Sequence, residues 1–291
     1  PLLFVLLLIL LFYAFETGAF QQGLNYLFNP DFSKLTTHGI LSAMGHAFFT
    51  LSLGMGAIMV YGSYLPKETS IAKASIAVAV MDTLIALTAG MVIFPIVFAN
   101  GLEAGAGPGL IFKTLPLAFG HMDYGNFFGM LFFILLVFAA WTSSISLIEP
   151  AVTWCMKTYH LTRVKTAIIL GLLVWVLGLL TVFSFNLASD FTISSSISTK
   201  FGEFVILKDA TAFDFLFYLT SIIMLPMGGL MIAVFAGWLM KHKYARKELE
   251  ISDFWFSVWK FLIKFVAPIM VIIVFLNAMG VIAFVRNILA V

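Results

Sequence analysis

The sequence has 291 residues, of which 62% are hydrophobic and only 10% are charged, with 32 phenylalanines and a mean hydropathy of +1.08. Soluble globular domains of this length do not have such a composition, so the chain is predicted to be an integral membrane protein. The net charge of +2 gives no basis for nucleic-acid binding. The single cysteine, Cys155, excludes a disulfide framework or a cysteine metal site within this chain.

Apolar segments long enough to cross ~30 Å of hydrocarbon, at about 20 residues each, occur six times in the chain. They are Ile40 to Leu65, Ile71 to Ala99, Phe127 to Met156, Val164 to Phe185, Phe213 to Met240 and Phe261 to Phe284. A seventh, Pro1 to Phe15, is cut short, and we expect the chain to be the C-terminal part of a longer polypeptide. The predicted fold class is an all-α polytopic membrane protein with about seven transmembrane helices, in a single membrane domain over residues 1–291.

The segment Gly45 to Pro66 is membrane-length but carries a polar interruption with two glycines at Thr50 to Gly56, TLSLGMG. Lipid cannot replace the backbone hydrogen bonds that such a break gives up, so it is tolerated only where protein or a cavity covers it. The freed groups then become ligand sites, with the last carbonyls of the first half-helix facing a cation and the start of the second half facing an anion. The alternative is a kinked structural helix whose glycines serve only close packing.

The following helix contains a carboxylate, Asp82, far from either end. An ionisable residue at membrane depth is costly, so it indicates a functional site by default. The alternative is a carboxylic acid that is kept neutral and hydrogen-bonded to Thr83 or Thr88.

A second polar stretch, WTSSISLI, lies within the next long apolar segment. Its hydroxyl residues are too many for all of them to face lipid: Thr142, Ser143, Ser144 and Ser146. Such residues usually bond a carbonyl of their own helix. Their density favours a partial alkali-cation site, in which two hydroxyls join the Ala139 carbonyl one turn earlier. Glu149 is expected at the inner mouth, where its carboxylate reaches water.

The remaining segments carry no predicted chemistry. Val164 to Phe185 is apolar all round, with Gly171 and Gly178 at a packing spacing, and Asn186 to Ala210 is predicted to be a polar outer loop. In the next helix, MLPMGGLM (Met224 to Met231) predicts a kink. No Walker loop, HEXXH helix, GxSxG elbow or haem-binding cysteine pattern occurs, and no nucleophile lies near a base at membrane depth, so no enzyme is expected.

Basic residues are distributed unequally between the two sets of loops. If the turn at Pro66 is cytoplasmic, the inner loops hold Lys67, Lys73, Lys157, Arg163, Lys165, Lys241, Lys243, Arg246 and Lys247, and the outer side keeps only Lys34, Lys113, Lys200, Lys208 and Arg286. This asymmetry follows the positive-inside rule. The sequence therefore predicts a multi-pass protein of the cell (inner or plasma) membrane.

Two segments together resemble a known family. FFTLSLGMGAIMVYGSYLPK (Phe48 to Lys67) and AAWTSSISLIEP (Ala139 to Pro150) are similar to helices six and eight of the neurotransmitter:sodium symporter family, in its bacterial amino-acid branch. The resemblance runs from Pro1 to the end of the chain and implies a leucine-transporter-like inverted-repeat fold, with helices five to eleven present and helices one to four absent. It also implies sodium-coupled secondary active symport of a neutral, hydrophobic or aromatic amino acid by alternating access. A non-transporting or channel-like membrane protein of the same fold is the alternative.

The resemblance further implies which residues form the sites. The substrate would contact Phe49, Thr50, Ser52, Met55, Ser143 and Leu147. One sodium site would include Thr50 and Asp82, a second would include the Ala139 carbonyl with the Thr142 and Ser143 hydroxyls, and the absent helices would complete both.

Three positions depart from the family pattern. Asp82 stands where the family usually has an asparagine. His46 and Ala86 stand where chloride-dependent members have glutamine and serine. Chloride is therefore not expected to bind, and Asp82 is expected to supply the fixed negative charge in its place.

Overall fold

The structure is a computed structural model that describes residues 2–105, 107–199 and 202–289. The described residues are mainly helical and include one two-stranded hairpin. The chain divides into two compact units, Pro1–Leu35 with Ile76–Ile145 and Thr36–Ser75 with Ser146–Val291. Two long helices, α5 (Ile71–Ala99) and α8 (Gly125–Tyr159), run from one unit into the other.

The first unit contains most of α5, residues 76–99, and the first part of α8, residues 125–145. Its other elements are α1 (Leu2–Glu16), α2 (Phe20–Phe28), η1 (Phe32–Lys34), α6 (Gly107–Gly109), η2 (Leu110–Thr114) and α7 (Leu115–His121). Its core joins α1, α5, α7 and α8 through side chains such as Leu10, Ile96 and Leu115, which are fully buried. Because lipid tails are as apolar as these side chains, such residues stabilise the unit through close van der Waals packing.

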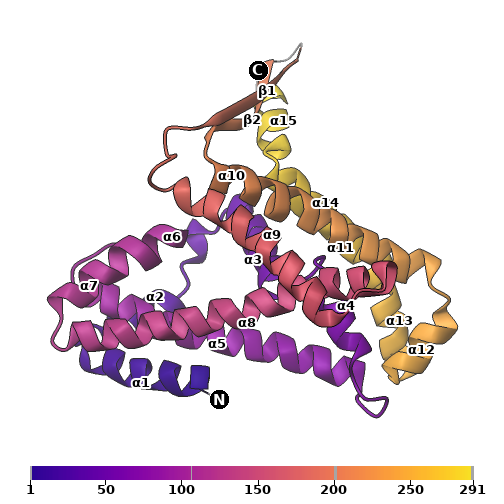
Figure 1. Ribbon diagram of the computed structural model, residues 1–291, viewed down its shortest axis with the longest axis horizontal. Helices are drawn as coiled ribbons and strands as arrows, with labels where there is room; N and C mark the ends of the chain where they lie inside the picture. Colours follow the sequence, from indigo (N-terminus) through magenta and orange to yellow (C-terminus); the bar gives the residue numbers. More distant parts are fainter. Residues whose placement is uncertain (1, 106, 200–201, 290–291) are drawn as a thin grey trace. The chain divides into compact units, whose positions relative to one another are not determined.

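The second unit contains the interrupted helix and the C-terminal helices. Its elements are α3 (Thr37–Thr50), α4 (Ala57–Ser63), α9 (Arg163–Phe183), β1 (Ile193–Thr199), β2 (Gly202–Ala210), α10 (Ala212–Phe217), η3 (Tyr218–Met224), α11 (Leu225–Val234), η4 (Phe235–Leu239), α12 (His242–Leu249), α13 (Asp253–Phe261), η5 (Leu262–Val266), α14 (Ala267–Ala278) and α15 (Val281–Leu289). Within this unit α11 packs along α14, which also packs against α3 (Figure 1).

Most of the predicted membrane spans are present. Five described helices are long and apolar enough to cross a membrane, and α1 with α2, bent by 112°, would make a sixth. The predicted bounds of the last span are wrong. It covers Asp253–Ala278 instead of Phe261 to Phe284, because Gly280 adopts a left-handed conformation with φ of 76° and ends the helical run.

The predicted polar loop between α9 and α10 is largely a β-hairpin. Strands β1 and β2 pair antiparallel, with Ser196 opposite Val205, and Ser194 Oγ accepts a hydrogen bond of 2.9 Å from the Asp209 amide. The serine-rich composition of β1 hid a strand pair that also contains the β-branched residues Ile193, Ile197, Val205 and Ile206.

The kink predicted at MLPMGGLM corresponds to a change of helix type. The π-helical segment η3 ends at Met224, and Pro226 then stands in the first turn of α11. The missing N–H of proline is tolerated there. A π-helical segment within a helix is rare and marks a local distortion of the hydrogen-bond pattern.

Candidate functional site

The predicted break in the sixth-helix segment is present. Helix α3 ends at Thr50 and α4 begins at Ala57, and Figure 1 draws them as separate helices. Between them, Ser52, Gly54 and Gly56 have φ values of 53°, 85° and 79°. Glycine adopts this left-handed region readily, whereas a serine there is uncommon and signals a constrained turn. The glycines of TLSLGMG are therefore required by the backbone and not only by close packing.

The break leaves backbone groups without helical partners. The Leu53 amide donates to the Phe48 carbonyl at 3.1 Å, and the next backbone donor with a backbone acceptor, among the residues that the structure describes, is Val60, which donates to Gly56 at 3.1 Å. Amides at such a break, and those in the first turn of α4, can donate to a ligand. The lipid core supplies no water to accept hydrogen bonds from such amides, so a polar ligand would accept them instead.

Four of the predicted substrate residues lie together at the break. Phe49 and Thr50 occupy the last turn of α3, and Ser52 and Met55 belong to the turn that follows. Phe49 is half exposed, and the Thr50 hydroxyl contacts the Ala47 carbonyl at 3.4 Å. Leu147 belongs to the same unit, on α8, and is also half exposed.

The other predicted site residues belong to the first unit. On α8 the Thr142 hydroxyl lies 3.0 Å from the Ala139 carbonyl oxygen and 3.1 Å from that of Phe138. Two of the oxygens predicted for the second sodium site are thus neighbours on one helix. A hydroxyl that donates its proton to its own helix still has oxygen lone pairs that can accept, so this hydrogen bond by itself does not decide between a packing role and a ligand role.

Asp82 lies in α5, next to two threonines that were its alternative partners. The Thr83 hydroxyl donates to the Ala79 carbonyl at 3.0 Å, and the Thr88 hydroxyl donates to Leu84 at 2.7 Å. Both hydroxyl protons are used by the helix backbone, so neither threonine donates to an ionised Asp82 carboxylate through that proton. A neutral Asp82 carboxyl could still donate to a threonine oxygen, and the role of Asp82 stays a prediction.

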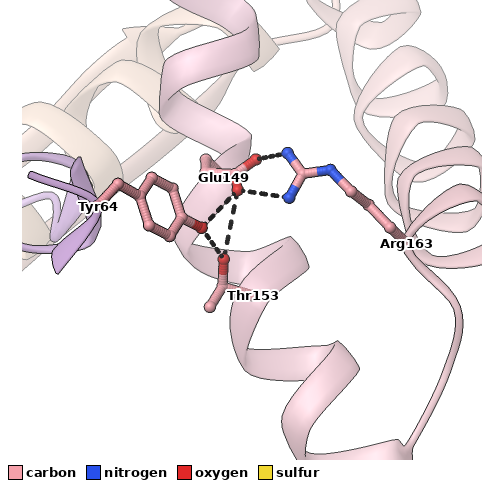
Figure 2. Close-up of polar contacts among 4 residues, drawn as sticks. All are labelled: Tyr64, Glu149, Thr153 and Arg163. Carbon is pink, nitrogen blue, oxygen red and sulfur yellow. Dashed lines mark hydrogen bonds and ion pairs between the residues drawn. The ribbon is translucent and has the colours of Figure 1, made fainter.

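Glu149 is the centre of a polar cluster that sequence reasoning missed (Figure 2). Its Oε1 accepts hydrogen bonds from the Tyr64 hydroxyl at 2.8 Å and from Arg163 at 2.9 Å, and its Oε2 accepts a second bond from Arg163 at 2.7 Å. Thr153 Oγ1 lies 3.4 Å from Oε1 and 3.1 Å from the Tyr64 hydroxyl. The expectation that Glu149 reaches water is wrong, because its side chain is only 5% exposed.

This cluster ties three helices together within the second unit. Tyr64 caps the C-terminus of α4, Glu149 and Thr153 lie one turn apart on α8, and Arg163 begins α9. A bidentate arginine–carboxylate pair fixes both distance and orientation. The inner half of the broken helix is thereby attached at its end to α8. No local sequence signal shows this, because Tyr64 and Glu149 are 85 residues apart.

Membrane-length helices together with a helix interrupted by left-handed residues are the architecture of broken-helix secondary transporters. Comparison with known proteins agrees with this class. The chain belongs to the sodium:neurotransmitter symporter family, whose family model matches residues 2–286.

Bacterial relatives match along almost the whole chain. The sodium-dependent transporter YhdH of Bacillus subtilis (strain 168) is 32% identical over 98% of the chain and 61% of its own length. A sodium-dependent transporter of Haemophilus influenzae (strain Rd) is also 32% identical, over 95% of the chain and 58% of its own length. The chain thus spans about three-fifths of the length of these relatives.

A solved structure gives the fold. The crystal structure of MhsT in complex with L-phenylalanine superposes with a TM-score of 0.81 at 40% sequence identity, over 96% of this chain and 60% of that one. The chain therefore has the leucine-transporter-like fold that the two motifs predicted.

Proposed function

We propose that the protein containing this chain is a sodium-coupled symporter that imports a neutral, hydrophobic or aromatic amino acid across the cell membrane by alternating access. The observation that carries this proposal is the break at Leu51 to Gly56, which frees backbone groups in a chain 40% identical to a protein crystallised with L-phenylalanine. The relatives named sodium-dependent transporters support the choice of driving ion.

The substrate is assigned to the residues around the break and to two positions of α8. Thr50 and Ser52 offer polar backbone atoms for the amino and carboxyl groups, and Ser143 offers a hydroxyl. Phe49, Met55 and Leu147 offer apolar surface for the side chain of the substrate. A pocket in which a few polar groups orient an otherwise apolar ligand suits an amino acid with a hydrophobic side chain.

Two sodium ions are assigned to oxygen ligands on three elements. The Thr50 hydroxyl and the Asp82 carboxylate would serve the first ion. The Ala139 carbonyl and the hydroxyls of Thr142 and Ser143 would serve the second. Carbonyl, hydroxyl and carboxylate oxygens are the hard ligands that such a cation prefers.

Asp82 would also act as the fixed counter-charge for the two sodium ions. Neighbouring cations repel each other in a site of low dielectric constant, and a carboxylate at ~4 Å offsets about 4 kcal/mol even at an effective dielectric constant of 20. Asp82 would then make bound chloride unnecessary.

The test is uptake of labelled L-phenylalanine into proteoliposomes that contain the complete gene product. We expect accumulation above equilibrium when an inward sodium gradient is imposed, and none when potassium replaces sodium. Competition by unlabelled amino acids should rank hydrophobic and aromatic side chains above charged ones. Equal uptake with potassium, or uptake that only equilibrates, would contradict symport and favour the channel-like alternative.

A further inference from the structure

Helix α11 approaches the break at membrane depth, backbone against backbone. Gly54, at the centre of the break, has no room for a side chain, because an added Cβ would overlap the Leu225 carbonyl oxygen and lie 2.8 Å from the Gly229 nitrogen. The relation is reciprocal. A Cβ added at Gly228 would overlap the Gly54 carbonyl oxygen and lie 3.2 Å from its carbon.

A second contact lies next to the first. A Cβ added at Gly229 would overlap the end of the Phe48 ring and lie 3.0 Å from both Cε atoms. Phe48 precedes the break in the last turn of α3, and Gly229 is buried. Consecutive glycines of α11 therefore meet the backbone of the break and the aromatic ring before it.

The close approach is local. At Gly56 the nearest described atoms to an added Cβ are Pro150 Cβ and Cγ, at 3.8 and 3.9 Å, and at Gly62 no described atom lies within 4 Å. A cavity of about 200 Å³ flanks the contact and is lined mainly by apolar side chains such as Ile58, Met59 and Val271. The break is therefore held by α11 at one place and borders empty apolar space next to it.

We propose that Gly228 and Gly229 of α11 are positioning residues, which set the path of the break and so place the backbone groups that bind sodium and substrate. Small residues allow membrane helices to approach at backbone distance, and here they do so against a segment that is not helical. Helix α11 packs along α14, and α14 also packs against α3. The helix that contacts the break and the helix that precedes the break are therefore both held by α14. The ligand part of this inference rests on the proposed function, whereas the positioning part does not.

The test compares substitutions in the complete gene product. Gly228→Ala places a methyl group against the backbone of Gly54, so relieving the overlap requires the break itself to move. Gly229→Ala places it against a side chain, and the double variant Gly229→Ala with Phe48→Leu removes that obstacle. Gly62→Ala is the matched control, since its methyl group meets open space among the described residues.

Two readouts separate position from ligand binding. The path of the break is followed by thiol labelling of Leu53→Cys in a Cys155→Ser background, because Leu53 lies in the break and is 40% exposed. Ligand binding is followed by the sodium concentration that gives half-maximal phenylalanine uptake. Protein recovery is measured for every variant.

We expect Gly228→Ala to change the labelling rate and to raise the half-saturating sodium concentration by about tenfold or more, ~1.4 kcal/mol. Gly229→Ala should change both readouts less. Adding Phe48→Leu should restore both readouts in Gly229→Ala but not in Gly228→Ala. Gly62→Ala should match wild type. The inference is overturned if Gly228→Ala behaves as Gly62→Ala in both readouts.

If Gly228→Ala cannot be recovered as folded protein, the Gly229 pair decides. If Phe48→Leu restores the labelling rate and the sodium response of Gly229→Ala, the positioning role of α11 is supported. If it restores neither, the inference is overturned. If wild type shows no sodium-dependent uptake but the labelling rates still separate Gly228→Ala from Gly62→Ala, the proposed function fails and the positioning role stands.

Discussion

The break between α3 and α4 and the hydroxyl-rich stretch of α8 both place polar groups at membrane depth, but by different means. The break departs from helical i→i−4 hydrogen bonding over residues 52–56 and offers backbone groups, at the cost of three left-handed residues. Helix α8 keeps its backbone bonds and offers side-chain oxygens, such as Thr142 Oγ1 at 3.0 Å from the Ala139 carbonyl. The first region should therefore be sensitive to any added Cβ, and the second to the loss of single oxygen atoms.

The largest expected effect is that of Gly54→Ala. The added methyl group requires a left-handed alanine, which costs roughly 1–2 kcal/mol, and also overlaps backbone of α11. Sodium-dependent uptake should be lost. Gly56→Ala is the control, because it shares the positive φ but has room for the methyl group, so it should lose only the conformational part. Thermal unfolding in detergent ranks the two, and equal losses would show that φ alone matters.

Thr142→Val should come next. It keeps the shape of the side chain and removes only the oxygen, so a sodium ligand predicts a half-saturating sodium concentration raised about tenfold, or ~1.4 kcal/mol. Ser144→Ala is the matched control, because Ser144 also bonds its own helix, at 2.8 Å to Ala140, but is assigned to no site. Sodium titration of uptake measures both. Less protein with a normal sodium response for Thr142→Val would indicate a packing hydroxyl.

Asp82→Asn extends the comparison to a carboxylate on the continuous helix α5. Wild-type uptake should be unchanged when gluconate replaces chloride, since Asp82 supplies the negative charge. The variant should transport weakly or become newly stimulated by chloride, because a mobile anion can then offset the sodium charge. Chloride-dependent uptake by the wild type would leave Asp82 as no more than a sodium ligand.

Met55→Phe should have the smallest effect, confined to selectivity. The flexible Met55 side chain can repack around a bulky apolar group, and a rigid ring at this position should favour smaller aliphatic amino acids. Sodium dependence should stay almost constant. Met231→Phe, at an exposed position of α11, serves as the control. An unaltered rank order of competing amino acids in Met55→Phe would remove Met55 from the substrate site.

The sequence was most informative where the signal was local. The glycines and polar residues of TLSLGMG sufficed to place the break, and apolar length sufficed for most spans. Contacts between distant segments could not be predicted in this way. Gly228 and Gly229 predicted only a kink, because their close neighbours, Gly54 and Phe48, are about 175 residues earlier in the chain. Glu149 was expected to reach water, since nothing near it in sequence identifies Tyr64 as its partner.

The length of α8 determines the surroundings of the ion pair between Glu149 and Arg163. Its 35 residues make a rod of roughly 50 Å at ~1.5 Å per residue, well beyond the ~30 Å of a hydrocarbon core. Glu149 lies ten residues before the last residue of this helix, Tyr159, so we expect the pair to lie near the boundary between lipid tails and headgroups. The exposure of the two side chains fits this position, at 5% for Glu149 and 59% for Arg163. We therefore expect dissolved ions to reach the pair from the arginine side, and the strength of the pair should fall as the salt concentration around it rises.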